Sequence, residues 1–334
     1  MLDRAHWNGA RWTAGEPRGH YESWFQRANH PTRPLAFWIR YTIFSPKGRP
    51  TDAIGELWAM YFDGEQNKII AAKEERSVRE CHFTKSELDA RVGEATLNGA
   101  HLRGEASTAA HTLSWALSYE SPHPPLLTFA RKLYGAPIPK AKALVGSPNA
   151  VYRGQLKVDG EPIDIDGWVG SQNHNWGEKH TDEYAWGQVA GFAEEEDAFL
   201  EVACGRIKVG PVLTPAMTIL TLRVRGEEFA FNTIGEGLKA YGKYDFFRFA
   251  FEAENDDVTI AGNIAAGVSD FVGLPYYNPP GGTKTCLNSK IARCDLTIRR
   301  RGQPPQMLST RNRAAFEILT TDTDHGVPVL DPRA

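Results

Sequence analysis

The stretch SQNHNWGEKHTDEYAWGQ, residues 171–188, carries two histidines, two tryptophans and a tyrosine among glycines, amides and acidic side chains. Such a concentration of proton-transferring and aromatic groups is typical of the wall of a ligand pocket. An upstream stretch, HYESWFQRANHPTRPLAFWIRY at residues 20–41, has a similar arrangement. There Glu22 and Trp24 lie two apart, as do His174 and Trp176 in the later stretch. Because residues two apart in a strand share a face, we interpret the two stretches as matching parts of a duplicated barrel.

The apolar runs along the rest of the chain predict an antiparallel all-β protein. Short runs alternate with clusters of Gly, Pro, Asn and Asp from Leu35 to Val169, and again from Tyr184 to Leu319. The segment 35–43 is apolar on both faces of the expected strand. Such a strand is covered on one side and lines something on the other. We therefore expect a barrel with an internal cavity, or two barrels packed against each other.

The length of 334 residues is sufficient for two domains. The segment APIPKAKALVGSPNA, residues 136–150, has the Pro-, Ala- and Lys-rich composition of a linker. This composition predicts an N-terminal barrel over residues 1–145 and a C-terminal barrel over residues 146–334. Between Pro125 and Gly135, apolar residues recur at helical spacing, which predicts a short helix that connects the halves or plugs one barrel end.

Composition argues against several classes of function. The net charge is −3, and the 38 basic and 41 acidic residues are scattered, whereas a nucleic-acid-binding protein needs a basic stripe. The four cysteines form no CxxC pair and no HExxH motif occurs, so we expect buried thiols and no metal site. No run of 18 apolar residues is present, which predicts a cytoplasmic protein without a transmembrane segment. An open alternative is that a hydrophobic substrate brings the protein into transient contact with a membrane surface.

His174 is the first candidate for proton transfer, because an imidazole can take up or release a proton near neutral pH. Glu201, on a neighbouring apolar run, is one of the carboxylates expected to tune it. A histidine that only satisfies backbone groups at a strand end is an equally open alternative. Glu22 lies in an aromatic segment, where a carboxylate needs a partner such as Arg27 or Arg40. Without a cation, burial would raise the pKa of Glu22 and make it a general acid.

The aromatic and amide side chains around these candidates form the expected ligand-binding surface. Indole and phenol rings suit a cation or an extended apolar ligand, and core packing is the alternative role for each tryptophan. The expected ligand-binding residues are Trp24, Trp38, Trp58, Asn175, Trp176, Tyr184, Trp186 and Gln188.

Four segments resemble the tandem lipocalin-like proteins, a superfamily that includes carotenoid 1,2-hydratase, tocopherol cyclase and lipocalin-like Diels–Alderases. These segments are GHYESWFQR (19–27), NHNWG (173–177), YAWGQ (184–188) and TCLNSKIARCDLTI (285–298). The resemblance implies two lipocalin-like barrels, no cofactor and a hydrophobic ligand of isoprenoid or polyene type. The chemistry that it implies is cyclisation or water addition at a carbon–carbon double bond.

His174 and Trp176 are similar to the His-x-Trp motif of the hydratases in this superfamily. The partner Tyr and Asp of the hydratase site have no clear counterpart, because FLEVACGR at residues 199–206 offers Glu201 instead. That departure leaves room for a cyclase. We therefore expect a cyclase or hydratase for a hydrophobic small molecule, bound in a barrel or at the domain interface. A non-catalytic carrier of a lipid or pigment is the alternative.

Overall fold

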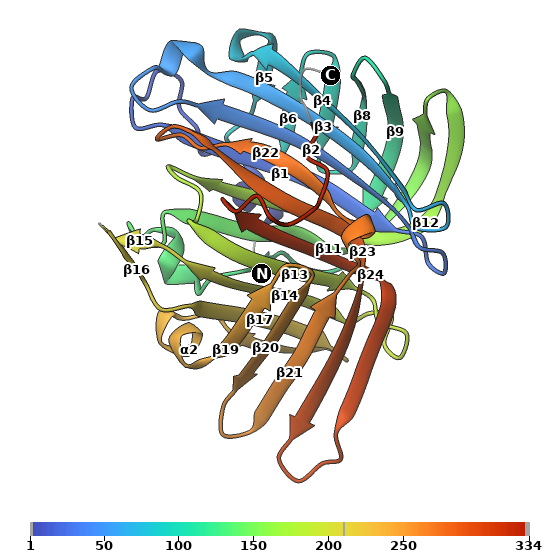
Figure 1. The fold of residues 1–334 in the computed structure, drawn as a ribbon, viewed down its shortest axis with the longest axis vertical. Coiled ribbons are helices and arrows are strands. Elements are labelled where there is room, and N and C mark those ends of the chain that lie inside the picture. Colours follow the sequence, from blue (N-terminus) through green and yellow to red (C-terminus); the bar gives the residue numbers. More distant parts are fainter. Residues whose placement is uncertain (1–2, 210, 331–334) are drawn as a thin grey trace.

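Two large antiparallel sheets pack against each other in the computed structural model, which describes residues 3–209 and 211–330 (Figure 1). The first is 12-stranded, in the order β4-β3-β2-β1-β12-β11-β9-β8-β7-β6-β5, with β10 beside β11. It is nearly closed, since β4 approaches β8 and β9. The second is 10-stranded, in the order β18-β17-β14-β13-β24-β23-β21-β20-β19, with β22 beside β23. The expected antiparallel all-β fold is confirmed.

The first sheet contains the strands β1 His20–Asn29, β2 Leu35–Ser45, β3 Ile54–Asp63, β4 Lys68–Ser77, β5 Cys81–Phe83, β6 Asp89–Val92, β7 Ala95–Asn98, β8 His101–Ser107, β9 Thr112–Glu120, β10 Leu126–Leu127, β11 Ala141–Val158 and β12 Glu161–Gly177. The second sheet contains β13 Glu183–Ala190, β14 Phe199–Arg206, β17 Met217–Val224, β18 Glu227–Phe231, β19 Tyr241–Asp245, β20 Arg248–Glu254, β21 Val258–Ala265, β22 Val272–Tyr277, β23 Thr283–Arg300 and β24 Gln306–Thr320. A separate pair consists of β15 Lys208–Val209 and β16 Val212–Leu213, and the two α-helices are α1 Arg4–Asn8 and α2 Ile234–Lys239.

Strand β2 shows how one apolar strand serves two environments. Phe37 and Ile39 lie in the core of the first barrel together with Trp168. Trp38, which points the other way, packs between the sheets with Leu319 of β24. The expectation that strands apolar on both faces are covered on one side and line a boundary on the other is therefore confirmed.

The chain passes from the first sheet to the second between β12 and β13, at residues 178–182. The boundary predicted after residue 145 falls inside β11, because β11 and β12 both pair with strands of the first sheet. Residues 141–150 of the segment that resembles a linker form the first, bulged part of β11, where the register with β12 shifts twice. Independent folding of the two halves stays a prediction.

The two stretches interpreted as counterparts in separate halves are neighbours in the first sheet. Strand β1 pairs with β12 in a register that sets Trp24 opposite His174 and Glu22 opposite Trp176. The run expected to end at Val169 continues as a strand to Gly177, which makes this pairing possible. The interpretation of these segments as equivalent positions in two barrels is therefore wrong.

The helix predicted between Pro125 and Gly135 is also wrong. That segment consists of β10 and a short 3-10 turn at Arg131–Tyr134, because Leu126 and Leu127 pair with β11. A different helix, α1, packs against the first barrel. Its residue Asn8 accepts a hydrogen bond at its main-chain oxygen from Trp24 Nε1, at 2.8 Å.

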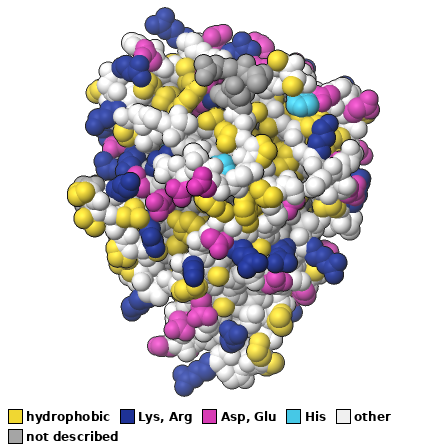
Figure 2. Space-filling view, in the orientation of Figure 1, with side chains coloured by type: hydrophobic (Ala, Val, Ile, Leu, Met, Phe, Trp, Pro, Cys, Tyr) yellow, Lys and Arg dark blue, Asp and Glu magenta, His cyan; other side chains and the backbone are white. Residues whose placement is uncertain are grey.

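Side chains of both charges are intermixed with apolar ones over the face shown in Figure 2. This distribution follows from the near balance of 38 basic and 41 acidic residues in the sequence. Within the described residues, no helix has the length and apolar character needed to cross a membrane.

The close approach of β1 and β12 requires a glycine at position 170. A methyl group there would overlap with the carbonyl oxygen of Arg27 and with Ala28 Cα, both of which are backbone atoms. We expect Gly170→Ala to lower the free energy of unfolding by about 1–3 kcal/mol or more, measured by urea denaturation. Gly99→Ala is the control, because a methyl group at Gly99 meets no atom within 4 Å. Equal stability of the two variants would contradict this account of the strand pairing.

Candidate functional site

A cavity of about 340 Å³ lies between the two sheets. The first sheet supplies Tyr21, Phe25, Trp38 and Arg40 to its wall, and the second supplies Tyr184, Trp186, Glu201 and Glu317. These side chains meet because alternate residues of β1, β2, β13 and β14 point away from the two barrel cores and toward the opposite sheet. Its wall is therefore mainly apolar and aromatic, with a few ionisable groups, as is usual for a small-molecule site.

Glu201 is the ionisable group with the clearest capacity for proton transfer at this wall. Its carboxylate oxygens accept hydrogen bonds from Trp186 Nε1 and Gln188 Nε2, each at 2.8 Å. Burial raises the pKa of Glu201 to about 7, although these two hydrogen bonds act to lower it. At neutral pH a large fraction of Glu201 is therefore protonated, and both of its neighbours are donors that cannot accept its proton. The acid form has its proton available for a ligand in the cavity.

The amide of Gln188 fixes the position of Glu201. Its Oε1 accepts hydrogen bonds from Arg27 Nε at 2.8 Å and from Ser171 Oγ at 2.6 Å, so its Nε2 is oriented for donation. Nε2 donates to Glu201 and also to Asn173 Oδ1, at 2.8 Å. A buried amide with all these bonds has one orientation, and it holds the carboxyl group rigidly.

The ion pair of Lys290 and Glu317 also lies between the two sheets, close to Glu201. Lys290 Nζ is 2.8 Å from Glu317 Oε1 and 2.5 Å from Asn288 Oδ1. The ammonium group also lies 5.5 Å from the centre of the Trp186 ring. Since the Lys290 side chain has no exposed surface, its charge depends on this carboxylate for compensation.

His174 occupies a different environment from the one expected. Its ring has no exposed surface and stacks on Trp24, with ring centres 4.8 Å apart. Nε2 is 2.8 Å from Glu22 Oε1 and Nδ1 is 3.1 Å from the carbonyl oxygen of Trp7, so both nitrogens already have acceptors as partners. Burial lowers the pKa of His174, and ionised Glu22 opposes that effect. Residue 174 is among those that line the cavity, but both nitrogens of its imidazole are engaged, by Glu22 and by Trp7.

Glu22 is likewise held in a structural network rather than paired with Arg27 or Arg40. Besides the bond to His174, it accepts hydrogen bonds from the backbone N–H groups of Arg11 and Trp12. Burial acts to raise the pKa of Glu22, but the bonds with His174 and His20 prevail and hold it at about 2. A carboxylate that stays ionised at all ordinary pH values is a poor general acid.

The structure separates the residues expected at the site into two groups. Trp38, His174, Asn175, Tyr184, Trp186 and Glu201 line the cavity, and Gln188 supports Glu201 from behind. Glu22 and the imidazole of His174 pack around Trp24 in the first barrel, where Trp176 lies near His174 and under the Arg11 guanidinium. Trp58 is buried between the sheets beneath Lys73 and does not line the cavity.

Arg40, Lys290 and Glu317 were not predicted as site residues. Arg40 and Glu317 are the single charged residues of the apolar runs LAFWIRYTIF and AAFEIL, and Lys290 shares the run TCLNSKIARC with Arg293. A charge in such a run must be paired or face a ligand when the strand is buried on both sides. That signal was present in the sequence for all three residues.

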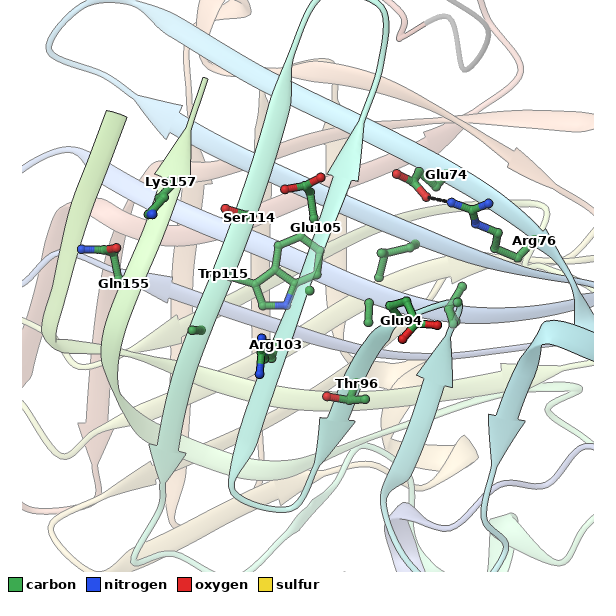
Figure 3. Close-up of a pocket in the computed structure, with 16 residues that line it drawn as sticks. Glu74, Arg76, Glu94, Thr96, Arg103, Glu105, Ser114, Trp115, Gln155 and Lys157 are labelled. Atoms are coloured by element: carbon green, nitrogen blue, oxygen red, sulfur yellow. Dashed lines mark hydrogen bonds and ion pairs between the residues drawn. The ribbon is translucent and has the colours of Figure 1, made fainter. Parts of the chain in front are cut away.

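A second hollow, of about 820 Å³, lies on the first barrel and is drawn in Figure 3. Its labelled side chains include groups of both charges, among them Glu74, Arg76, Glu94, Arg103 and Lys157. Glu74 and Arg76 form an ion pair at 2.8 Å, and their side chains remain partly exposed. This groove is larger than the interface cavity, but its charges are solvated, so we place the candidate site between the sheets.

Comparison with known proteins places this chain in a known fold. No family model matches it. An uncharacterized protein of Mycobacterium tuberculosis is 22% identical over 307 residues, which cover 91% of this chain and 86% of that protein. A crystal structure of a candidate AttH protein from Nitrosomonas europaea matches with a TM-score of 0.60 and 15% identity, covering 96% of each chain.

Two further structures have the same architecture. Kievitone hydratase from Nectria haematococca matches with a TM-score of 0.56 and 11% identity, over 91% of this chain and 89% of the hydratase. CghA matches with a TM-score of 0.56 and 10% identity, over 91% of this chain and 88% of CghA, whose structure is also known with Sch210972. At these identities the likeness shows a shared lipocalin-like fold, in agreement with the resemblance noted in the sequence.

The raised pKa of Glu201 predicts a specific dependence of stability on pH. The pKa is about 7 in the folded chain, against an ordinary value of 4.5, so the folded state binds the proton more tightly. This contribution is complete below about pH 4.5 and is lost as the pH rises through 7. Relative to Glu201→Gln, the wild type should lose roughly 3 kcal/mol of unfolding free energy across this range. Urea denaturation at several pH values measures the difference, and parallel profiles for the two proteins would contradict the raised pKa.

Proposed function

We propose that the protein is a cofactor-independent enzyme of the cyclase or hydratase type, with its active site in the cavity between the sheets. The observation that carries the proposal is Glu201, a carboxyl group at an aromatic cavity wall whose burial raises its pKa to about 7. A general acid is most effective when its pKa lies near the working pH. The shared fold adds support, because one of the proteins with this architecture is a hydratase.

In the proposed reaction Glu201 donates its proton to a double bond or a carbonyl oxygen of the substrate. Positive charge then develops on the substrate beside the indole rings of Trp186 and Trp38, whose faces stabilise it. Ring closure or addition of water follows. Loss of a proton from the resulting cation to the Glu201 carboxylate restores the acid, so the cycle is balanced in protons and electrons.

The remaining cavity wall suits a hydrophobic substrate. Phe25 comes from the first sheet, Ile219 from the second and Leu238 from α2, so apolar groups surround the reacting centre on several sides. Such a wall excludes water and folds a flexible chain into a reactive shape. The fixed Gln188 keeps the acid in place while the substrate is held.

Incubation of the protein with a hydrophobic metabolite extract, followed by mass spectrometry, tests this function. We expect the wild type to convert one component into a product of the same mass, by cyclisation, or of that mass plus one water, by hydration. Turnover should fall as the pH rises through about 7, because the acid form of Glu201 is required. Glu201→Gln should lower turnover by about 100-fold or more.

Two further variants act as controls. Glu94→Gln alters an exposed carboxylate of the groove in Figure 3 and should leave turnover unchanged. His174→Gln should lower thermal stability, because it removes one of the hydrogen-bonding partners of buried Glu22, while the folded fraction keeps its turnover. A component that binds the wild type and Glu201→Gln equally and is released unchanged would show a carrier instead of an enzyme.

A further inference from the structure

Arg40 is a charged residue in the cavity wall for which the fold provides no hydrogen-bonding partner. It is 4% exposed, and no hydrogen bond or ion pair joins it to another described residue, so the carboxylates of Glu56 and Glu317 act on it only through space. Its guanidinium lies over the Tyr276 ring at 4.4 Å and near the Trp38 ring at 5.9 Å. A buried donor without an acceptor is costly, so its presence at a cavity indicates a group that binds from outside the protein chain.

The contact of Arg40 with Tyr276 leaves its N–H groups without acceptors. A cation–π contact is an attraction between the charge and the ring, and it does not replace the hydrogen bonds that the fixed fork of guanidinium N–H groups can donate. This fork matches two oxygens of a carboxylate or of a similar anion. Within the cavity wall as described, Trp38 Nε1 is a second buried donor without an acceptor.

The balance of buried charge between the sheets also favours a negatively charged ligand. Four cationic side chains, Arg27, Arg40, Lys73 and Lys290, are buried between the sheets or behind the cavity wall. Three carboxyl groups oppose them, and two of these are already committed, Glu56 to Lys73 and Glu317 to Lys290. Glu201 accepts from two neutral donors and is not in direct contact with Arg40. The surplus is positive, which favours an anionic ligand in this water-poor space.

Resting on the proposed function, we propose that the substrate is a hydrophobic molecule with an anionic oxygen group, a carboxylate or an enolate, which the Arg40 guanidinium binds. The anion anchors one end of the molecule near Tyr276, and the apolar remainder extends along Phe25 and Trp186 toward Glu201. Arg40 is thus a binding and positioning residue, and the acid remains Glu201.

Two fluorescent probes of matched shape test this assignment. 1-Anilinonaphthalene-8-sulfonate is anionic, and N-phenyl-1-naphthylamine is the same ring system without the sulfonate. We expect the full-length wild type to bind the anionic probe at least about tenfold more tightly than the neutral one. Arg40→Met should weaken the anionic probe by about tenfold or more, with less than a twofold change for the neutral probe. Arg103→Met, in the groove of Figure 3, should change neither affinity.

Arg40→Lys provides a second variant if Arg40→Met does not fold, as judged by circular dichroism. It retains the charge but loses the fork, so it should bind the anionic probe with an intermediate affinity. Equal affinity of the wild type and the Arg40 variants for the anionic probe would overturn the inference and leave the proposed function standing. Weakening by Arg103→Met instead of Arg40→Met would place anion binding in the groove and also overturn it. Failure of both probes to bind the wild type would count against the cavity itself, and so against the proposed function.

Discussion

Burial of ionisable side chains between two packed sheets is the constraint on which the rest of this structure depends. Arg27, Lys290, Glu201 and Glu317 lie where water has little access, and removal of a charge from water is costly unless partners replace it. Amide and indole groups supply those partners, and Gln188 joins Arg27 to Glu201 through the oxygen and the nitrogen of its amide group. These hydrogen bonds offset the cost of burying charges between the sheets, and they also fix the position of Glu201.

The all-β architecture can be predicted from residue patterns in the sequence. Apolar runs with turns between them indicate antiparallel strands, and the two apolar faces of residues 35–43 indicate a strand between two environments. The division between the sheets was harder to predict, because the bulges of β11 require the same Gly and Pro residues that a linker would contain. Composition alone does not distinguish an irregular strand from a connection.

The site was predicted in the right segment, and residue 174 lines the cavity, but the partners that hold its imidazole could not be predicted. Asn173, His174 and Asn175 all line the cavity, but side chains alternate along β12, so spacing alone does not determine which contacts each side chain makes. Pairing of β1 with β12 directs His174 toward Glu22 and Trp24, and that pairing joins residues about 150 positions apart in the chain. Local spacing contains no information about such a partner. Glu201 was expected as a carboxylate on a run neighbouring His174, whereas Arg40, Lys290 and Glu317 are charged residues inside strands that were not assigned to the site.

The two carboxyl groups Glu22 and Glu201 illustrate how surroundings assign roles. Both are buried, yet histidines and backbone N–H groups keep Glu22 ionised, whereas neutral side-chain donors leave Glu201 close to its protonated form. The central claim is therefore that Glu201 holds a proton near neutral pH at the cavity wall. A carbon-13 NMR titration of the glutamate carboxyl groups, with Glu201 assigned by comparison with Glu201→Gln, measures this directly. A midpoint near 7 would support the claim, and a midpoint near the ordinary 4.5 would contradict it.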